Sequence, residues 1–204
     1  SVTGAGTPIL LINDVPSGTS TSVEAGDQIK VRLTASADFE DEAVATVTIG
    51  GIDSTFSVTT RAAHTVPGTL TFPPVTGAEP GATVTSNAAI VSGIEVPTAI
   101  AVTGAGTPIL LINDTPAGTS SSVVAGDQVR VRLTASAAFE GEAVATVTIG
   151  GVSSTFSVTT RAAHTVPGTL TFAPVTGAEP SQLVTSAAAE ITGIEVPMTI
   201  TVTG

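Results

Sequence analysis

Two histidines, His64 and His164, are the side chains of this sequence best suited to acid–base chemistry, and each lies in the same run, RAAHTVP. A histidine near serine and aspartate residues could belong to a hydrolytic triad. The chain has no G-x-S-x-G element to present a nucleophilic serine, and no oxyanion element can be placed. Two histidines 100 residues apart are not a zinc motif either. We therefore predict no enzyme activity and no catalytic residues, and we interpret both histidines as linker residues packed between domains.

An acidic loop is the second candidate site, because Ca²⁺ takes oxygen ligands from loops of this kind. The loop carries four carboxylates, on Asp38, Glu40, Asp41 and Glu42. The equivalent loop 100 residues later has Ala138 and Gly141 in place of two of these acids, and neither loop contains a D-x-[DN]-x-[DN]-G pattern. We interpret the loop as a solvated tip, and we predict no metal site and no cofactor.

Three other ligand classes are weighed from the sequence. Calcium bound near a linker stays open as an alternative, with Glu79, Glu95 or Asp14 as ligands. The run TGAGT at residues 3–7 is not followed by a helix-forming segment, so a nucleotide site is not expected. The chain has no tryptophan and no tyrosine to form an aromatic platform for a sugar, which disfavours a carbohydrate-binding module.

Composition excludes further partners. The net charge is -11 with only six lysines plus arginines, whereas nucleic acids and anionic membranes bind cationic patches. The longest apolar runs are far shorter than the roughly 20 residues that span a bilayer. We therefore expect no nucleic acid partner and no membrane insertion in this segment. The sequence also lacks cysteine and a signal-peptide pattern, so an export signal would have to lie outside it.

The elements that must position these residues are short strands. Residues 25–36 read AGDQIKVRLTAS, and their alternation places Ile29, Val31 and Leu33 on one face, which is typical of a half-buried strand. Residues 43–49 and 54–60 alternate on either side of a Gly-Gly pair, which predicts a hairpin. No helical period appears anywhere in the chain.

One strand face is predicted by comparing two copies of the same segment. Position 90 is isoleucine and its copy is Glu190, so this position is predicted to face water. Alternation then places Ala89 and Val91 toward the core, and the same is expected of their copies, Ala189 and Ile191.

The whole chain repeats itself with a period of 100 residues. Shifting the sequence by 100 matches about 79 of 100 positions without an insertion, which is the signature of a tandem array. About seven short strands per repeat, with turn signals between them, favour an antiparallel β-sandwich.

These residues resemble a known class of repeat. The runs GDQVRVRLTAS, ATVTIGGVSSTFSVTTRAA and TLTFAPVTGAEP are similar to the Ig-like or fibronectin-III-like tandem repeats of very large bacterial secreted and surface proteins. The resemblance covers the whole chain. It implies an all-β fold of tandem Ig-like sandwiches, an extracellular or cell-surface location, and a stalk or adhesin segment. The core tryptophan and the tyrosine corner of antibody-type domains are missing, so this is not a true immunoglobulin domain.

The position of the domain border has two interpretations. Counted by period, the repeats cover residues 1–100 and 101–204. The phasing that the resemblance implies makes residues 68–167 one complete domain, with residues 1–67 and 168–204 as complementary parts of others. An orphaned half-sandwich would expose its core and unpaired strand edges. The two parts should therefore pair within the chain as a permuted domain, pair head to tail between chains, or belong to a longer continuous array. The simpler alternative places the border near residue 100.

The sequence predicts a structural stalk or spacer segment of an extracellular bacterial adhesin or filament. Its expected partners are copies of itself, head to tail, or the adjacent repeats of a longer chain. Two alternatives remain: an accessory module that binds glycans or makes calcium-dependent contacts, and a phage or virion decoration domain.

Overall fold

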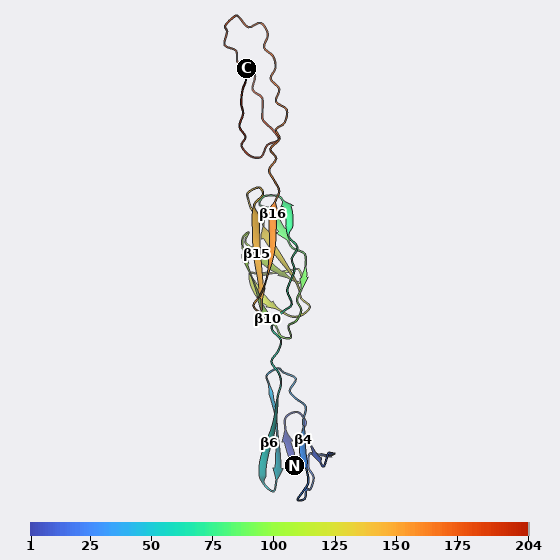
Figure 1. The fold of residues 1–204 in the computed structure, drawn as a ribbon. Coiled ribbons are helices and arrows are strands. Elements are labelled where there is room, and N and C mark those ends of the chain that lie inside the picture. Colours follow the sequence, from blue (N-terminus) through green and yellow to red (C-terminus); the bar gives the residue numbers. More distant parts are fainter. Residues whose placement is uncertain (204) are drawn as a thin grey trace. The chain divides into compact units, whose positions relative to one another are not determined.

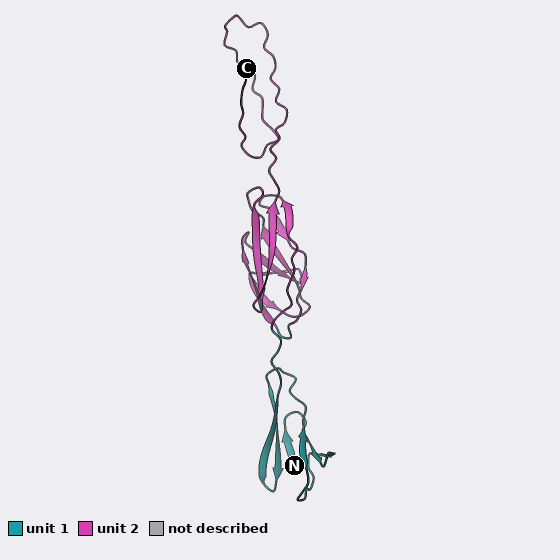
Figure 2. Ribbon diagram, in the orientation of Figure 1, with its two compact units in different colours: residues 1–65, 94–96 teal, residues 66–93, 97–204 magenta. Residues whose placement is uncertain are grey.

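The computed structural model describes residues 1–203 and divides the chain into two compact units (Figure 2). Unit 1 consists of residues 1–65 and 94–96, and unit 2 consists of residues 66–93 and 97–204. All regular structure in the described residues is β-strand, and none of them forms a helix that could cross a membrane.

Unit 1 contains two three-stranded sheets. Their strands are β1 (Val2–Gly4), β2 (Ile9–Ile12), β3 (Val15–Gly18), β4 (Ile29–Arg32), β5 (Glu42–Ile49) and β6 (Ile52–Thr59). One sheet has the order β1-β5-β6 and the other the order β3-β2-β4, with antiparallel neighbours. A small core forms between them from Val2, Leu10 and Ala45.

Unit 2 contains two larger sheets, both built from residues 75–160. Their strands are β7 (Val75–Ala78), β8 (Thr83–Thr85), β9 (Ala89–Ile90), β10 (Thr98–Gly104), β11 (Ile109–Ile112), β12 (Thr115–Gly118), β13 (Ser120–Val123), β14 (Gln128–Thr134), β15 (Glu142–Ile149) and β16 (Val152–Thr160). The orders are β13-β10-β15-β16-β7 and β12-β11-β14-β8, and β9 also pairs with β14. The predicted all-β sandwich is confirmed. Short edge strands raise the strand number to ten, and β7 pairs with β16 in parallel.

Strand alternation generates the core of unit 2 as the sequence predicts. In β14, Val129, Val131 and Leu133 are buried while the side chains between them are half-buried. β15 and β16 form the long hairpin seen in Figure 1, with Glu142 to Ile149 paired to Thr159 to Val152. Gly150 and Gly151 turn the chain at φ 52° and 83°, the positive φ values that a two-residue hairpin turn requires.

The same sequence pattern leaves unit 1 half-covered. β4 is the copy of β14, yet Ile29 is exposed and Val31 is only half-buried. The predicted hairpin also forms, as β5 and β6, but most β6 side chains are exposed. Alternation therefore fixes which face of each strand is apolar, and the neighbouring segments decide whether that face is buried.

Residues 168–203 are covered even less than the strands of unit 1. Their copies in the preceding repeat, residues 68–103, supply β7, β8, β9 and most of β10, but no residue of 168–203 belongs to a strand. Ala89 and Val91 are buried and Ile90 is exposed, as predicted, whereas Ile191 is exposed rather than inward-facing. The reason is that Val91 exchanges backbone hydrogen bonds with Gly126 and Asp127 in the complete sandwich, and Ile191 makes no equivalent bonds within the described residues.

Candidate functional site

A pair of oppositely charged side chains, Arg61 and Glu95, joins two chain segments of unit 1. Arg61 Nη1 donates to Glu95 Oε2 at 2.8 Å, and Nη2 donates to Oε1 at 2.6 Å, which is a bidentate ion pair. The His64 backbone N–H donates to Glu95 Oε2 at 2.9 Å, and the Glu95 N–H donates to the His64 carbonyl at 2.8 Å. We call this arrangement the first clamp.

The clamp recurs one period later. Arg161 Nη1 and Nη2 donate to the two carboxylate oxygens of Glu195 at 2.7 and 2.6 Å, and the His164 N–H donates to Glu195 at 2.7 Å. This second clamp has one additional partner, because Arg161 Nε donates to Glu79 Oε1 at 2.8 Å. The arginine–glutamate pair therefore recurs with the repeat. The third member of the second clamp, Glu79, comes from the loop that follows β7.

Both clamps are electrostatically stable ion pairs. The hydrogen bonds from Arg61 lower the pKa of Glu95 to about 2, with a smaller contribution from the His64 N–H. The equivalent bonds from Arg161 lower the pKa of Glu195 to about 2. The carboxylates raise the pKa of Arg61 and Arg161 in return. Both carboxylates are therefore ionised at any physiological pH, so the clamps are not pH switches in that range.

The two histidines contribute their backbones and not their imidazoles. Both side chains are exposed. The reason is that the backbone bridge between His64 and Glu95 fixes the main chain and leaves the ring outside. Sequence reasoning missed the clamps, although Arg61 and Glu95 both recur unchanged in the second repeat, which was an available signal.

The acidic loop is shaped by a threonine and not by its carboxylates. Thr60 Oγ1 donates to the Asp38 carbonyl at 2.6 Å and accepts from the Asp41 N–H at 3.0 Å. Thr160 makes the same two bonds, to the Ala138 carbonyl and from the Gly141 N–H, where the acids are absent. Because both loops are held alike, the geometry does not depend on a bound cation.

The alternative calcium ligands are each engaged by a cation of the protein. Asp14 pairs with Lys30, Glu79 with Arg161, and Glu95 with Arg61. No group of three or more metal-ligating side chains occurs within residues 1–203. The aromatic rings beside the loops are likewise engaged, since Arg61 lies 5.1 Å from the Phe39 ring centre and Arg161 lies 5.1 Å from that of Phe139.

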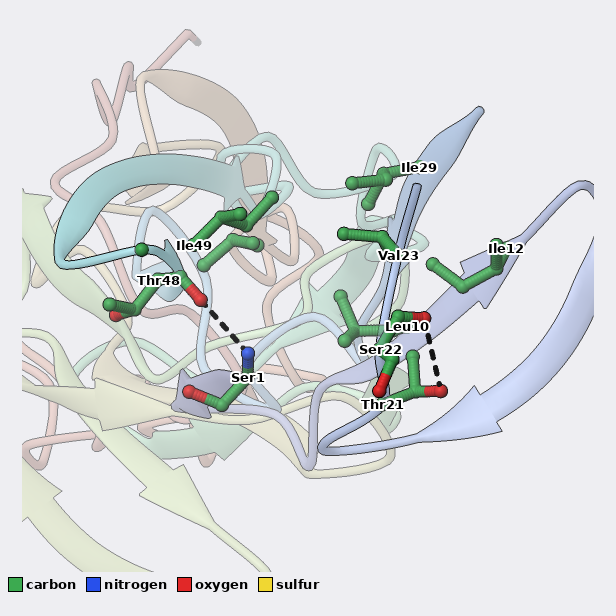
Figure 3. A pocket seen from close by; sticks show the side chains of 11 residues that line it. Ser1, Leu10, Ile12, Thr21, Ser22, Val23, Ile29, Thr48 and Ile49 are labelled. Carbon is green, nitrogen blue, oxygen red and sulfur yellow. Dashed lines mark hydrogen bonds between the residues drawn. The ribbon is translucent and has the colours of Figure 1, made fainter. Parts of the chain in front are cut away.

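Unit 1 contains a pocket of about 280 Å³ between its two sheets. Figure 3 shows Leu10, Ile12 and Ile29 on one side and Ile49 on the other, with the Ser1 amino group donating to the Thr48 carbonyl at 2.9 Å. In unit 2 the equivalent place is occupied by the chain itself. There β10 pairs with β13 on one side and with β15 on the other, and Ile100 is 1% exposed.

No protein-family model matches the chain, and no curated protein is similar to it. Among solved structures, domains 4–9 of the surface layer protein SbsC align with a TM-score of 0.37 and 16% identity, over 83% of this chain and 24% of that structure. SbsC domains 4 and 5 align with a TM-score of 0.33 and 16% identity, over 79% and 70%. The titin I9–I11 tandem aligns with a TM-score of 0.28 and 14% identity, over 78% and 56%. The chain spans about a quarter of the first of these structures, and the similarity is too distant to carry a function to this chain.

Proposed function

We propose that this chain is a spacer segment of an extracellular bacterial surface protein, built from Ig-like domains in the phasing 68–167. The observation that carries the proposal is the recurrence of the clamp, Arg61 with Glu95 and Arg161 with Glu195, one period apart. Both copies of the repeat keep the same clamp, and the described residues contain no cluster of catalytic side chains. These features suit a segment whose function depends on its length and stiffness.

The clamp has a mechanical role in this proposal. It ties residues 61–64 to residue 95 directly before the chain enters unit 2 at residues 66 and 97. Two tied segments resist bending and stretching better than one free segment, because both must distort together. A bidentate arginine–carboxylate pair adds directional hydrogen bonds to the attraction of the charges.

The alternatives from the sequence gain less support. A glycan-binding face commonly uses tryptophan or tyrosine platforms, which the chain lacks, and the Phe39 and Phe139 rings beside the loops are each faced by an arginine. Calcium-dependent contact at the linker would need carboxylates without cationic partners, and Glu79 and Glu95 have such partners. The spacer is therefore the function that these contacts favour.

Force spectroscopy tests the spacer role. The full chain, pulled from its two ends, should show a discrete unfolding event that releases about 100 residues, or about 330–360 Å of extended chain. The variant Glu195→Gln should lower the force of that event, and Glu190→Gln, which changes an exposed glutamate outside the clamp, should not. A featureless extension without a discrete event would contradict the proposal. Antibodies against residues 68–167 should label intact cells, which tests the extracellular location separately.

A further inference from the structure

We propose that the first clamp is a folding device for unit 2, because it closes the loop that supplies the first strands of that unit. The path of the chain makes this possible. The chain leaves unit 1 after residue 65, contributes residues 66–93 to unit 2, returns to unit 1 with residues 94–96, and enters unit 2 again at residue 97 (Figure 2). The inference goes beyond the spacer function, since it concerns how one domain depends on the segment before it.

The loop between the two ends supplies three strands. β7, β8 and β9 all lie within residues 69–91, which we call the covering loop. β7 pairs with β16, and β8 and β9 pair with β14. The loop also supplies core side chains, because Leu70, Phe72 and Val91 are buried. Unit 2 therefore completes its core only when the covering loop folds onto it.

Two backbone hydrogen bonds join the ends of the covering loop. The Gly68 N–H donates to the Ser92 carbonyl at 2.9 Å, and the Glu95 N–H donates to the His64 carbonyl at 2.8 Å. We call the segments joined in this way, residues 64–68 and 92–95, the neck. The Glu95 carboxylate adds its bonds from Arg61 and from the His64 N–H. The main chain and the first clamp therefore close the same loop.

Glycine at position 93 lets the two segments of the neck lie close together. Gly93 has a φ of 81°, and a Cβ atom there would lie 3.1 Å from the Gly68 nitrogen and 3.3 Å from the Val66 carbonyl oxygen. A side chain would therefore meet the backbone of the opposite segment, in a conformation that favours glycine in any case. Gly193 has a φ of 80° and equally close backbone neighbours. The neck, like the clamp, thus recurs with the repeat.

Closing the loop beforehand lowers the entropy that unit 2 loses when it folds. An open chain must bring the two ends of the loop together before β7, β8 and β9 can all pair. The neck and the clamp already hold these ends, so the unfolded covering loop has fewer conformations to give up. Cross-links stabilise folded domains in the same way, by restricting the unfolded chain.

The clamp acts on unit 2 without bonding to it. Among the described residues, the Glu95 side chain bonds to Arg61 and to His64, and both belong to unit 1. Removing the Glu95 carboxylate should therefore destabilise a unit in which it has no partner. A clamp that only strengthens its own surroundings would affect unit 1 alone.

Hydrogen exchange of the full chain, read residue by residue by NMR, distinguishes these two outcomes. The paired amides of β15 and β16 report the opening of unit 2, and those of β5 and β6 report the opening of unit 1. Glu95→Gln should raise the exchange rates of the most protected β15 and β16 amides by roughly three- to fivefold, the effect of losing one surface ion pair of good geometry. Arg61→Gln, which removes the same pair from the other side, should have the same effect.

Asp14→Asn is the matched control. Asp14 forms a surface ion pair with Lys30 inside unit 1, but this pair closes no loop that enters unit 2. Asp14 has a φ of 68°, a conformation that asparagine also adopts readily. The exchange rates of β15 and β16 should stay unchanged in this variant.

Two results would overturn the proposal. One is a rise in exchange confined to unit 1 when either member of the Arg61–Glu95 pair is replaced. The other is an equal rise in β15 and β16 caused by Asp14→Asn, because loop closure would then not be the cause. Neither result bears on the unfolding force of the complete unit, so a failure here is distinct from a failure of the spacer function.

Discussion

Arg61 and Glu95 are separated by 34 positions in the sequence and meet in a bidentate ion pair with N–O distances of 2.6 and 2.8 Å. The pair joins the segment that ends the β5–β6 hairpin to the segment that precedes β10. Arg161 and Glu195 repeat it with the same 34-position separation. Both clamps are built mostly from groups at the surface, so their value lies in fixing two segments together more than in bulk stability.

The clamp carboxylates should titrate far below ordinary glutamates. The pKa of Glu95 and of Glu195 is about 2, against 4.5, because an arginine donates two hydrogen bonds to each. A carboxylate with a depressed pKa stabilises the folded state above the unfolded pKa, and this contribution is lost as the pH falls from about 4.5 toward 2. Carboxyl-carbon NMR across pH 2–6 measures it. Midpoints for both residues near 4.5 would contradict the ion pair.

Thr160→Val should destabilise unit 2 by about 1–3 kcal/mol, because it leaves the Ala138 carbonyl and the Gly141 N–H without their hydroxyl partner. Thr160 is 3% exposed, so water does not easily replace the lost bonds. Urea unfolding measures the free energy, and Thr160→Ser, which keeps the hydroxyl, is the control. Equal effects of the valine and serine variants would show that the hydroxyl is not the cause.

Phe156→Ala and Phe56→Ala should differ in cost although the two residues share their local sequence. Phe156 is fully buried, and its truncation should cost about 3–5 kcal/mol of unfolding free energy. Phe56 is partly exposed, so its truncation should cost clearly less in dilute monomer. Urea unfolding of the two variants compares them. Equal costs of the two truncations would contradict the burial difference.

Calcium should not stabilise the chain. A site for Ca²⁺ filled at about 100 times its Kd would add about 2.7 kcal/mol to the free energy of unfolding. The candidate ligands Glu79 and Glu95 are held by arginines, and both acidic loops are held by a threonine. Thermal unfolding with excess calcium chloride and with a chelator should give the same midpoint. A calcium-dependent rise, lost in Asp38→Asn with Asp41→Asn, would restore the loop as a metal site.

Much of the fold could be predicted from local pattern. The alternation in residues 128–134 correctly indicates which side chains of β14 are buried, and Gly150-Gly151 correctly indicates the hairpin turn. The Ile90-to-Glu190 replacement correctly indicates that position 90 faces water. These features depend on neighbours two or three positions away, so the sequence displays them directly.

The clamps could not be found in this way, because each joins residues 34 or more positions apart and Glu79 lies 82 positions from Arg161. The backbone bridge between His64 and Glu95 is also invisible in the sequence, because its two residues lie 31 positions apart.

The sequence alone determined the apolar faces of the alternating segments, the hairpin turns and the 100-residue period. Only the tertiary structure decided which copy of each segment forms a strand and which copy is buried. Phe56 and Phe156 lie in identical local sequences, STFSVTT, and yet one is 42% exposed and the other 0%. The physical reason is that a strand's own residues fix the direction of its side chains, whereas burial requires a second segment to exclude water. That segment is supplied by residues far along the chain in unit 2.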